Sequence, residues 1–155
     1  MRCFRRISVP VKRLPCLPPA PIITYANGAT GIAKLRRDGF VSLETENDGE
    51  IITRKLTFKG KKKHFFINAE TEDGGGISVK ILSADKKTVI AESTQFTGDS
   101  TRAELDFGDF DLSKLEGETF RLHFYVTAGK IYSFWFSDSE NGESGGYDAA
   151  GNVNA

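Results

Sequence analysis

The sequence predicts an all-β fold, a single antiparallel β-sandwich of jelly-roll type. Short apolar or alternating runs recur along the chain and are separated by turn residues at close, fairly regular spacing. No helical period links these runs, which argues against alternating strands and helices. The chain has 155 residues, the length of one domain, and its 16 glycines and 12 phenylalanines fit many turns around an aromatic core.

Charge and proline content divide the chain into three parts. Residues 1–30 form a basic leader that holds all five prolines and both cysteines, and we expect it to be disordered. Residues 31–137 form the predicted sandwich. Residues 138–155 form an acidic tail rich in glycine and asparagine, also expected to be disordered. Because both cysteines lie in the leader, no disulfide is expected to stabilise the core.

The leader carries no recognisable targeting signal. Its first arginines are not followed by an apolar stretch of about 7–15 residues, so we identify no export signal and assign no compartment. No apolar run approaches the roughly 20 residues that a membrane-spanning helix needs. The basic charges are spread too widely to predict a nucleic acid or a membrane as the partner. The lysine-rich run 59–63 is expected to be a solvated loop that protects the next strand from aggregation, rather than a polyanion site.

Nine strands are expected between the leader and the tail. Asp48-Gly49 and Ala128-Gly129 are expected to close hairpins, because glycine accepts the positive φ that tight turns require. One short helical turn is expected at 111–117, with Ser113 as its N-cap and Gly117 at its end. The expected strands are 32–36, 40–45, 51–58, 64–70, 77–82, 88–92, 101–106, 120–127 and 130–137.

Alternation with a period of two assigns the faces of these strands. Burying each inward side chain contributes about 1.5–3 kcal/mol, so the alternation should determine the register. The residues expected to face inward are Phe120, Leu122, Phe124 and Val126 in one strand, and Ile77, Val79 and Ile81 in another. The residues expected to face outward from the first of these strands are Arg121, His123 and Tyr125.

The last expected strand is strongly aromatic, and its two faces compete for the core. Tyr132, Phe134 and Phe136 share one face, and Trp135 lies on the other. The phenylalanine pair is the natural core face, which leaves Trp135 outward or at a domain seam, where it can stack on a sugar ring or a neighbouring domain. A buried, structural Trp135 is the alternative, and the sequence does not decide between them.

Motifs that suggest catalysis have simpler explanations. The sequence at 142–146 matches G-x-S-x-G, but it lies in the tail and no histidine follows His123. Two histidines and two leader cysteines supply no zinc site, and Asp106, Asp109 and Asp111 miss the spacing of a calcium loop. We therefore expect no enzyme activity, no metal and no cofactor. A small hydrolase built on carboxylates such as Asp38 and Asp106 is a rival hypothesis.

An ordered series of segments is similar to a known module. The segments are 31–43, 53–60, 66–69, 98–101, 111–117, 121–124 and 131–135. Together they resemble the C-terminal β-sandwich appended to bacterial β-propeller glycoside hydrolases of the invertase/levanase-like and sialidase-like kinds. The resemblance implies that the catalytic carboxylates belong to a propeller, and that the sandwich supports it, joins oligomer contacts or touches glycan. The parent enzymes are, by the same resemblance, extracytoplasmic.

The resemblance predicts a non-catalytic, carbohydrate-associated accessory module. Its partner would be a polysaccharide or a β-propeller glycoside hydrolase domain, and a homodimer is a further expectation. Arg37 and Asp38, beside Gly39, are the candidate domain contacts. The alternative function is a structural, docking or oligomerisation domain that binds no sugar. The candidate sugar contacts are Trp135, with Tyr125 or Tyr132, for stacking, and Arg121 or His123 for hydrogen bonds to hydroxyls.

Overall fold

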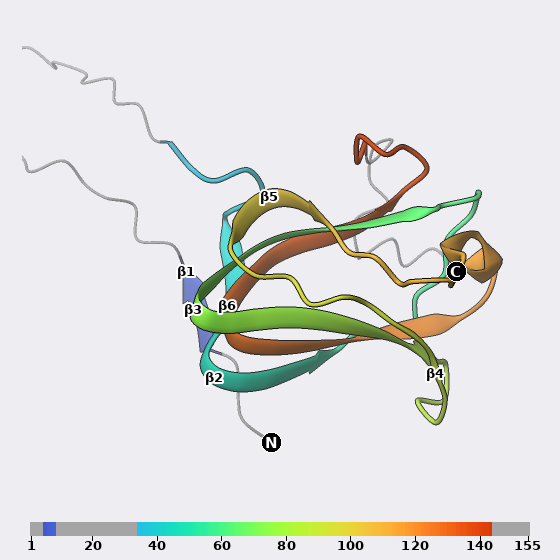
Figure 1. Cartoon of the computed structure of the whole chain (residues 1–155), viewed down its shortest axis with the longest axis horizontal. Coiled ribbons are helices and arrows are strands. Elements are labelled where there is room, and N and C mark those ends of the chain that lie inside the picture. Colours follow the sequence, from blue (N-terminus) through green and yellow to red (C-terminus); the bar gives the residue numbers. More distant parts are fainter. Residues whose placement is uncertain (1–4, 9–33, 144–155) are drawn as a thin grey trace, which may run out of the picture.

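The computed structural model describes residues 5–8 and 34–143. Within them the fold is all-β and antiparallel, as the sequence predicts (Figure 1). The jelly-roll connectivity stays a prediction. No helix in these residues is long and apolar enough to cross a membrane. The elements are β1 (Arg5–Ser8), β2 (Val41–Ile52), β3 (His64–Ser83), β4 (Val89–Glu92), β5 (Asp99–Glu104), the 3-10 turn η1 (Leu112–Leu115) and β6 (Phe120–Ser137).

The strands form one sheet with the order β1-β2-β6-β3-β4, and β5 also pairs with β3. β3 and β6 pair along almost their whole length, from His64 opposite Ser137 to Ser83 opposite Phe120. The two longest strands therefore form the centre of the sheet, and the shorter strands flank them.

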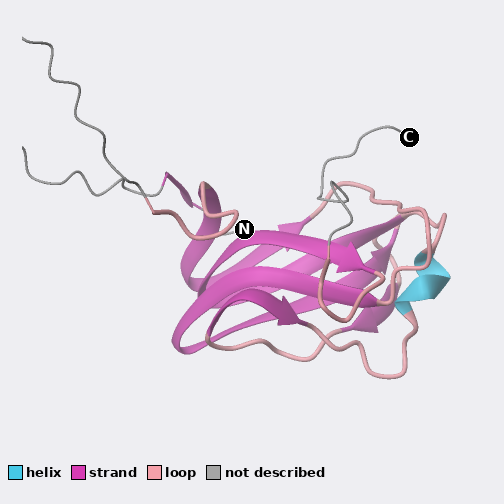
Figure 2. Cartoon of the chain, turned by 90° about the horizontal axis from the view of Figure 1, so that it is seen from above, coloured by secondary structure: helices cyan, strands magenta, loops and turns pink. Residues whose placement is uncertain are grey.

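This single sheet supplies both layers of a sandwich, because its long strands bend at the same level (Figure 2). The register shifts between Thr45 and Asp48 in β2 and between Thr71 and Gly76 in β3. Such irregularities bend a strand and increase its twist. We call the two halves layer A and layer B. Layer A contains 41–45, 64–71, 129–137, β1 and β5, and layer B contains 48–52, 76–83, 120–127 and β4.

The two hairpins expected from the sequence are wrong. Asp48-Gly49 and Ala128-Gly129 lie inside the continuous strands β2 and β6, at the bends. Turn residues and bulge residues share the same chemistry, since both need unusual backbone angles: Ala128 has a φ of 41°. The bends also press backbones together. A Cβ on Gly75 would lie 2.5 Å from the carbonyl oxygen of Ala128, so only glycine fits there.

The core lies between the layers and is centred on aromatic rings. Phe65 of layer A lies 6.4 Å from Phe124 of layer B, and Phe120 of layer B lies 5.7 Å from Phe136 of layer A, measured between ring centroids. The inward sets predicted for 120–126 and 77–81 are confirmed. Their fully buried members are Phe120, Leu122, Phe124, Val126, Ile77, Val79 and Ile81.

Several local expectations need correction. Residues 34–36 form no strand, and the expected strand 51–58 ends at Ile52, after which Leu56 and Phe58 make only isolated bridges. Asp111 rather than Ser113 is the N-cap of η1, because its carboxylate accepts a hydrogen bond from the Ser113 N–H. The leader was expected to be disordered, but its residues 5–8 form β1 and pair with β2. The lysine run was expected to be solvated, but Lys62 is buried while its neighbours in the run are exposed.

Candidate functional site

Trp135 is buried, which decides between the two alternatives for Trp135 in favour of the structural one and against an outward position. Only 6% of the residue is exposed, and its ring stacks on Phe66 with 5.6 Å between centroids. The cover comes from residues 138–143, which we call the C-terminal clasp. The indole N–H of Trp135 donates to the carbonyl of Gly142 at 3.0 Å, and the Ser137 hydroxyl donates to the carbonyl of Glu143 at 2.7 Å. These six residues therefore pack on layer A instead of continuing as a free tail.

Arg121, His123 and Tyr125 project from the outer face of layer B, and each is already engaged. Arg121 donates to the carbonyls of Ala84 and Thr53 at 3.1 and 2.8 Å. His123 is mostly buried, with its Nε2 atom 3.1 Å from a Glu50 carboxylate oxygen. The centroid of the Tyr125 ring lies 4.1 Å from the centroid of the His123 ring and 5.1 Å from the Lys80 ammonium nitrogen.

Tyr132 lies in layer A, apart from those three residues. The Arg36 guanidinium sits over its ring, 4.7 Å from the centroid. Burial raises the pKa of the Tyr132 phenol, and a hydrogen bond with Glu70 raises it further. The five candidate sugar contacts thus lie in both layers, with Trp135 and Tyr132 in layer A and Arg121, His123 and Tyr125 in layer B.

Arg37 and Asp38 lie at the exposed turn that precedes β2. Their side chains are 61% and 56% exposed, and the Arg37 Nε atom lies 3.7 Å from an Asp38 carboxylate oxygen. Asp38 has the positive φ of this turn, 53°. Gly39 is required for a different reason: a Cβ there would lie 2.7 Å from the Cβ of Arg36. The turn leaves the next residue, Phe40, 78% exposed.

An apolar groove opens between the layers beside β2. Its volume is about 260 Å³, and its walls come from both layers, so the groove reaches the edge of the core. The hydroxyl oxygen of Ser133 is buried in the wall without a hydrogen-bond partner among the described residues. Exposed Phe40 directly precedes the lining residue Val41. The groove is lined by Val41, Ser42, Leu43, Ile51, Phe124, Ile131, Tyr132, Ser133 and Phe134.

Sequence reasoning missed this groove. The only local signal was the run Phe40-Val41-Ser42-Leu43, in which apolar residues occupy both faces of the strand and Phe40, Val41 and Leu43 are all exposed in the structure. Apart from Ile51, the other walls come from Phe124 and 131–134, which lie more than 80 positions further along the chain and which no local pattern brings together with 41–43.

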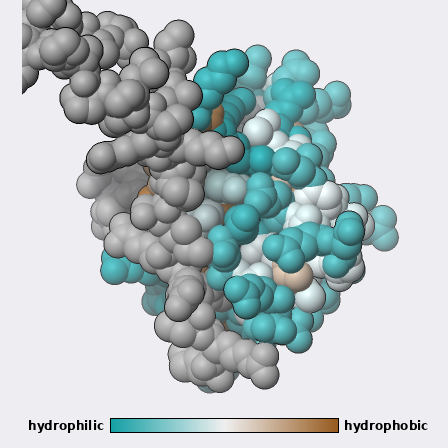
Figure 3. Space-filling model, turned by 90° about the vertical axis from the view of Figure 1, so that its left-hand side faces the viewer, coloured by the Kyte–Doolittle hydropathy of each residue, from teal (hydrophilic) through white to brown (hydrophobic). Residues whose placement is uncertain are grey.

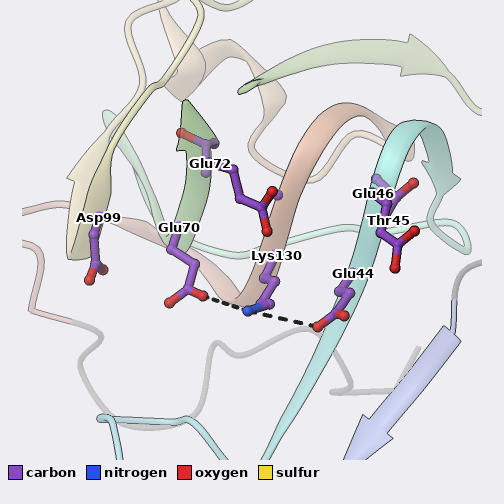
Figure 4. A pocket seen from close by; sticks show the side chains of 9 residues that line it. Glu44, Thr45, Glu46, Glu70, Glu72, Asp99 and Lys130 are labelled. Atoms are coloured by element: carbon purple, nitrogen blue, oxygen red, sulfur yellow. Dashed lines mark hydrogen bonds and ion pairs between the residues drawn. The ribbon is translucent and has the colours of Figure 1, made fainter. Parts of the chain in front are cut away.

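A second cavity, the acidic pocket, lies where the long strands bend (Figure 4). It has a volume of about 310 Å³. Lys130 lies between two carboxylates, 2.8 Å from Glu70 and 3.9 Å from Glu44, and the bond to Glu70 raises the pKa of Lys130. The described surface at this end of the molecule is mainly hydrophilic (Figure 3). The pocket is lined by Glu44, Thr45, Glu46, Glu70, Thr71, Glu72, Asp99, Gly129 and Lys130.

The acidic pocket is polar, and most of its charged side chains are carboxylates. In the part of the chain that the structure describes, no group of three or more histidine, cysteine or acidic residues has the arrangement to hold a metal ion. The carboxylates instead outnumber the cations, and Arg36 and Lys130 neutralise only part of the charge. What the pocket offers is a set of hydrogen-bond donors and acceptors.

Comparisons with known proteins give no relative for this arrangement. No protein-family model matches the chain, and neither a curated protein nor a solved structure matches it. The similarity to the sandwich modules of glycoside hydrolases therefore stays a prediction.

Proposed function

We propose that this chain is a non-catalytic docking module that receives apolar side chains of another polypeptide in the apolar groove. The observation that supports the proposal is an open groove between the layers whose lining includes exposed Val41 and Leu43, directly after exposed Phe40 in the chain. Contiguous exposed apolar surface on a folded domain marks an interaction site more often than isolated apolar residues do.

The groove is better suited to binding an apolar side chain than to catalysing a reaction. Its only titratable lining residue is Tyr132, whose pKa is raised, so the phenol stays neutral over the ordinary pH range. The walls include the core residue Ile131 and Phe134, which packs against the core, so most of the surface offered to a ligand is apolar. Burying one Leu or Phe side chain in such a site contributes about 1.5–3 kcal/mol.

The test uses the full chain with Phe40→Ala, so that the exposed ring cannot compete for the groove. N-acetyl-phenylalanine amide is titrated while backbone amide signals are followed by NMR. Saturable shifts at 41–43 and 131–134 are expected, with none from N-acetyl-glutamine amide. Adding Ser133→Leu, which fills the groove, should abolish the shifts, whereas adding Val89→Ala on the distant β4 should not. Absence of saturable shifts at these residues would refute the docking proposal.

The carbohydrate-associated role is a second proposal, now centred on the acidic pocket instead of Trp135. Its support is the cluster of carboxylates around Lys130, beside partly buried Tyr132, because sugar hydroxyls bind to such donors and acceptors. Affinity electrophoresis of the full chain through fructan, arabinan and sulfated polysaccharides tests it. Retardation that Glu70→Gln and Lys130→Ala remove would support the role, and unhindered migration through every polysaccharide would reject it.

A further inference from the structure

We propose that the occupant of the apolar groove is Phe40 of a second copy of this chain, in a two-fold symmetric dimer. This inference rests on the proposed docking function and names its partner. Each copy would present Phe40 as a projection and the groove as its receptor, so that the two copies exchange identical contacts.

The projection is held in place by the preceding turn. Arg36 is anchored on β3 by bonds from its Nε atom to the Asn68 amide oxygen, 2.6 Å, and from Nη2 to the Ala69 carbonyl, 3.1 Å. The Gly39 N–H donates back to the Arg36 carbonyl at 2.9 Å, which closes the turn. Phe40 leaves this closed turn with 78% of its surface exposed. A ring on an anchored turn loses little conformational freedom when it binds.

The receptor lies next to the projection but is not filled by it. Phe40 is absent from the lining of the groove, although Val41, the next residue, contributes to it. A volume of about 260 Å³ accommodates an aromatic side chain, and the walls offered to it are largely apolar. Because the exposed Phe40 ring does not fill the groove of its own chain, it is available to the same groove on another molecule.

Adjacency of projection and receptor favours a closed dimer. When both lie on one patch, a two-fold axis through the patch forms both contacts at once, and no unsatisfied surface remains to extend a polymer. Val41 and Leu43, both exposed at the rim, would be buried around the axis. The outer edge of β2 is already paired with β1, so a partner reaches this site by side-chain insertion and not by adding a strand.

The charges beside the projection are self-complementary. Arg37 and Asp38 are adjacent, of opposite sign and more than half exposed. In a two-fold contact the turn of one copy meets the rim of the other, so each copy offers both a cation and a carboxylate. Exposed pairs of this kind add little affinity, but they select the orientation of the partners.

The first test is sedimentation equilibrium of the full chain, kept reduced so that Cys3 and Cys16 form no intermolecular bridges. The expected result is a concentration-dependent dimer. Phe40→Ala should raise the dimer dissociation constant at least tenfold, and Ser133→Leu should do the same by filling the groove. Val89→Ala, which changes an exposed apolar residue on β4, is the matched control and should leave the constant unchanged.

The second test locates the ring of residue 40. The full chain with p-benzoylphenylalanine at position 40 is prepared in ¹⁴N and ¹⁵N forms, mixed and irradiated, and the cross-linked peptides are identified by mass. Peptides of mixed isotope that join position 40 to 131–134 support the dimer. Adducts confined to one copy, including adducts to its own residues 9–33, overturn it.

The two proposals fail separately. A wild-type chain that stays monomeric, while its Phe40→Ala variant still binds N-acetyl-phenylalanine amide in the groove, refutes the dimer and leaves the docking function standing. A dimer that survives Phe40→Ala unchanged also refutes this inference. Loss of both self-association and amide binding removes both proposals.

Discussion

Arg36 and Asn68 hold the segment before β2 against the first half of β3. The Arg36 Nε atom donates to the Asn68 amide oxygen at 2.6 Å, and the Asn68 amide nitrogen donates to the Arg37 carbonyl at 2.6 Å. Asn68 is fully buried and lies where the β3–β6 register shifts. A buried amide thus uses an irregularity of the sheet to bind a loop more than 30 residues away.

Asn68→Ala should destabilise the fold, because it leaves the Arg36 guanidinium and the Arg37 carbonyl without their partner. We expect the free energy of unfolding to fall by about 2 kcal/mol or more, the cost of buried polar groups left unpaired. Urea denaturation measures this loss. Asn141→Ala, at an exposed position, is the control and should change stability by less than about 0.5 kcal/mol. Equal midpoints for the two variants would show that Asn68 does not hold the turn.

Trp135 should behave as a core residue. Trp135→Phe keeps a ring against Phe66 but loses the bond to the Gly142 carbonyl, so we expect a loss of about 1 kcal/mol. Trp135→Ala should cost about 3–5 kcal/mol, as for other buried aromatic residues. Because Trp135 is the single tryptophan, its fluorescence in the native chain should resist quenching by acrylamide. Strong quenching without unfolding would mean that the C-terminal clasp does not cover it.

Gly75 and Gly74 should differ in their tolerance of alanine. A Cβ on Gly75 would meet two backbone oxygens, those of Ala128 and Thr127, at 2.5 and 2.6 Å, and backbone cannot rotate away. Gly74 has a φ of 80° but open space around it, so alanine there costs only about 1 kcal/mol of backbone strain. Thermal melts should therefore rank Gly75→Ala well below Gly74→Ala. The opposite order would show that the bends of β3 and β6 are not in contact.

Stability should fall at alkaline pH. The pKa values of Tyr132 and Lys130 are both raised by folding, from ordinary values of 10.0 and 10.5. A raised folded-state pKa means that the native state binds the proton more tightly, so the contribution is complete below the ordinary pKa and is lost as pH rises through the folded-state pKa. Urea midpoints between pH 8 and 11 should decline above about pH 10. Tyr132→Phe should make that decline shallower, and an unchanged slope would exclude the phenol as a cause.

The parts of the fold that follow from local pattern were predictable. The inward sets at 77–81 and 120–126 depend only on alternation along one strand, and they are buried as expected. The hairpins at Asp48-Gly49 and Ala128-Gly129 were not, because a glycine-containing turn and a bend within a long strand use the same residues. Whether the chain reverses or continues is decided by pairing with a distant strand.

The site was less predictable because its surfaces are made by segments far apart in the sequence. From the sequence, Trp135 could be an outward platform, and residues 138–143 have the composition of a free tail. In the structure these six residues cover Trp135. The apolar groove needs 41–43, Ile51, Phe124 and 131–134 in one place. Alternation could identify the apolar side chains, but it could not show which of them the packed layers leave uncovered.

The sharing of both layers by the same long strands also has a kinetic consequence. The pair His64 and Ser137 is the first rung of the β3–β6 ladder in layer A, and its members are 73 positions apart in the chain. Neither layer can form alone from neighbouring residues, because each needs one half of β3 and one half of β6. Domains dominated by such distant pairings fold in milliseconds to seconds, far more slowly than helical bundles of the same size, since a long loop must close before its contacts stabilise it. A nascent chain must therefore keep Phe65 and Ile67 out of reach of other chains until residues 120–137 have been synthesised.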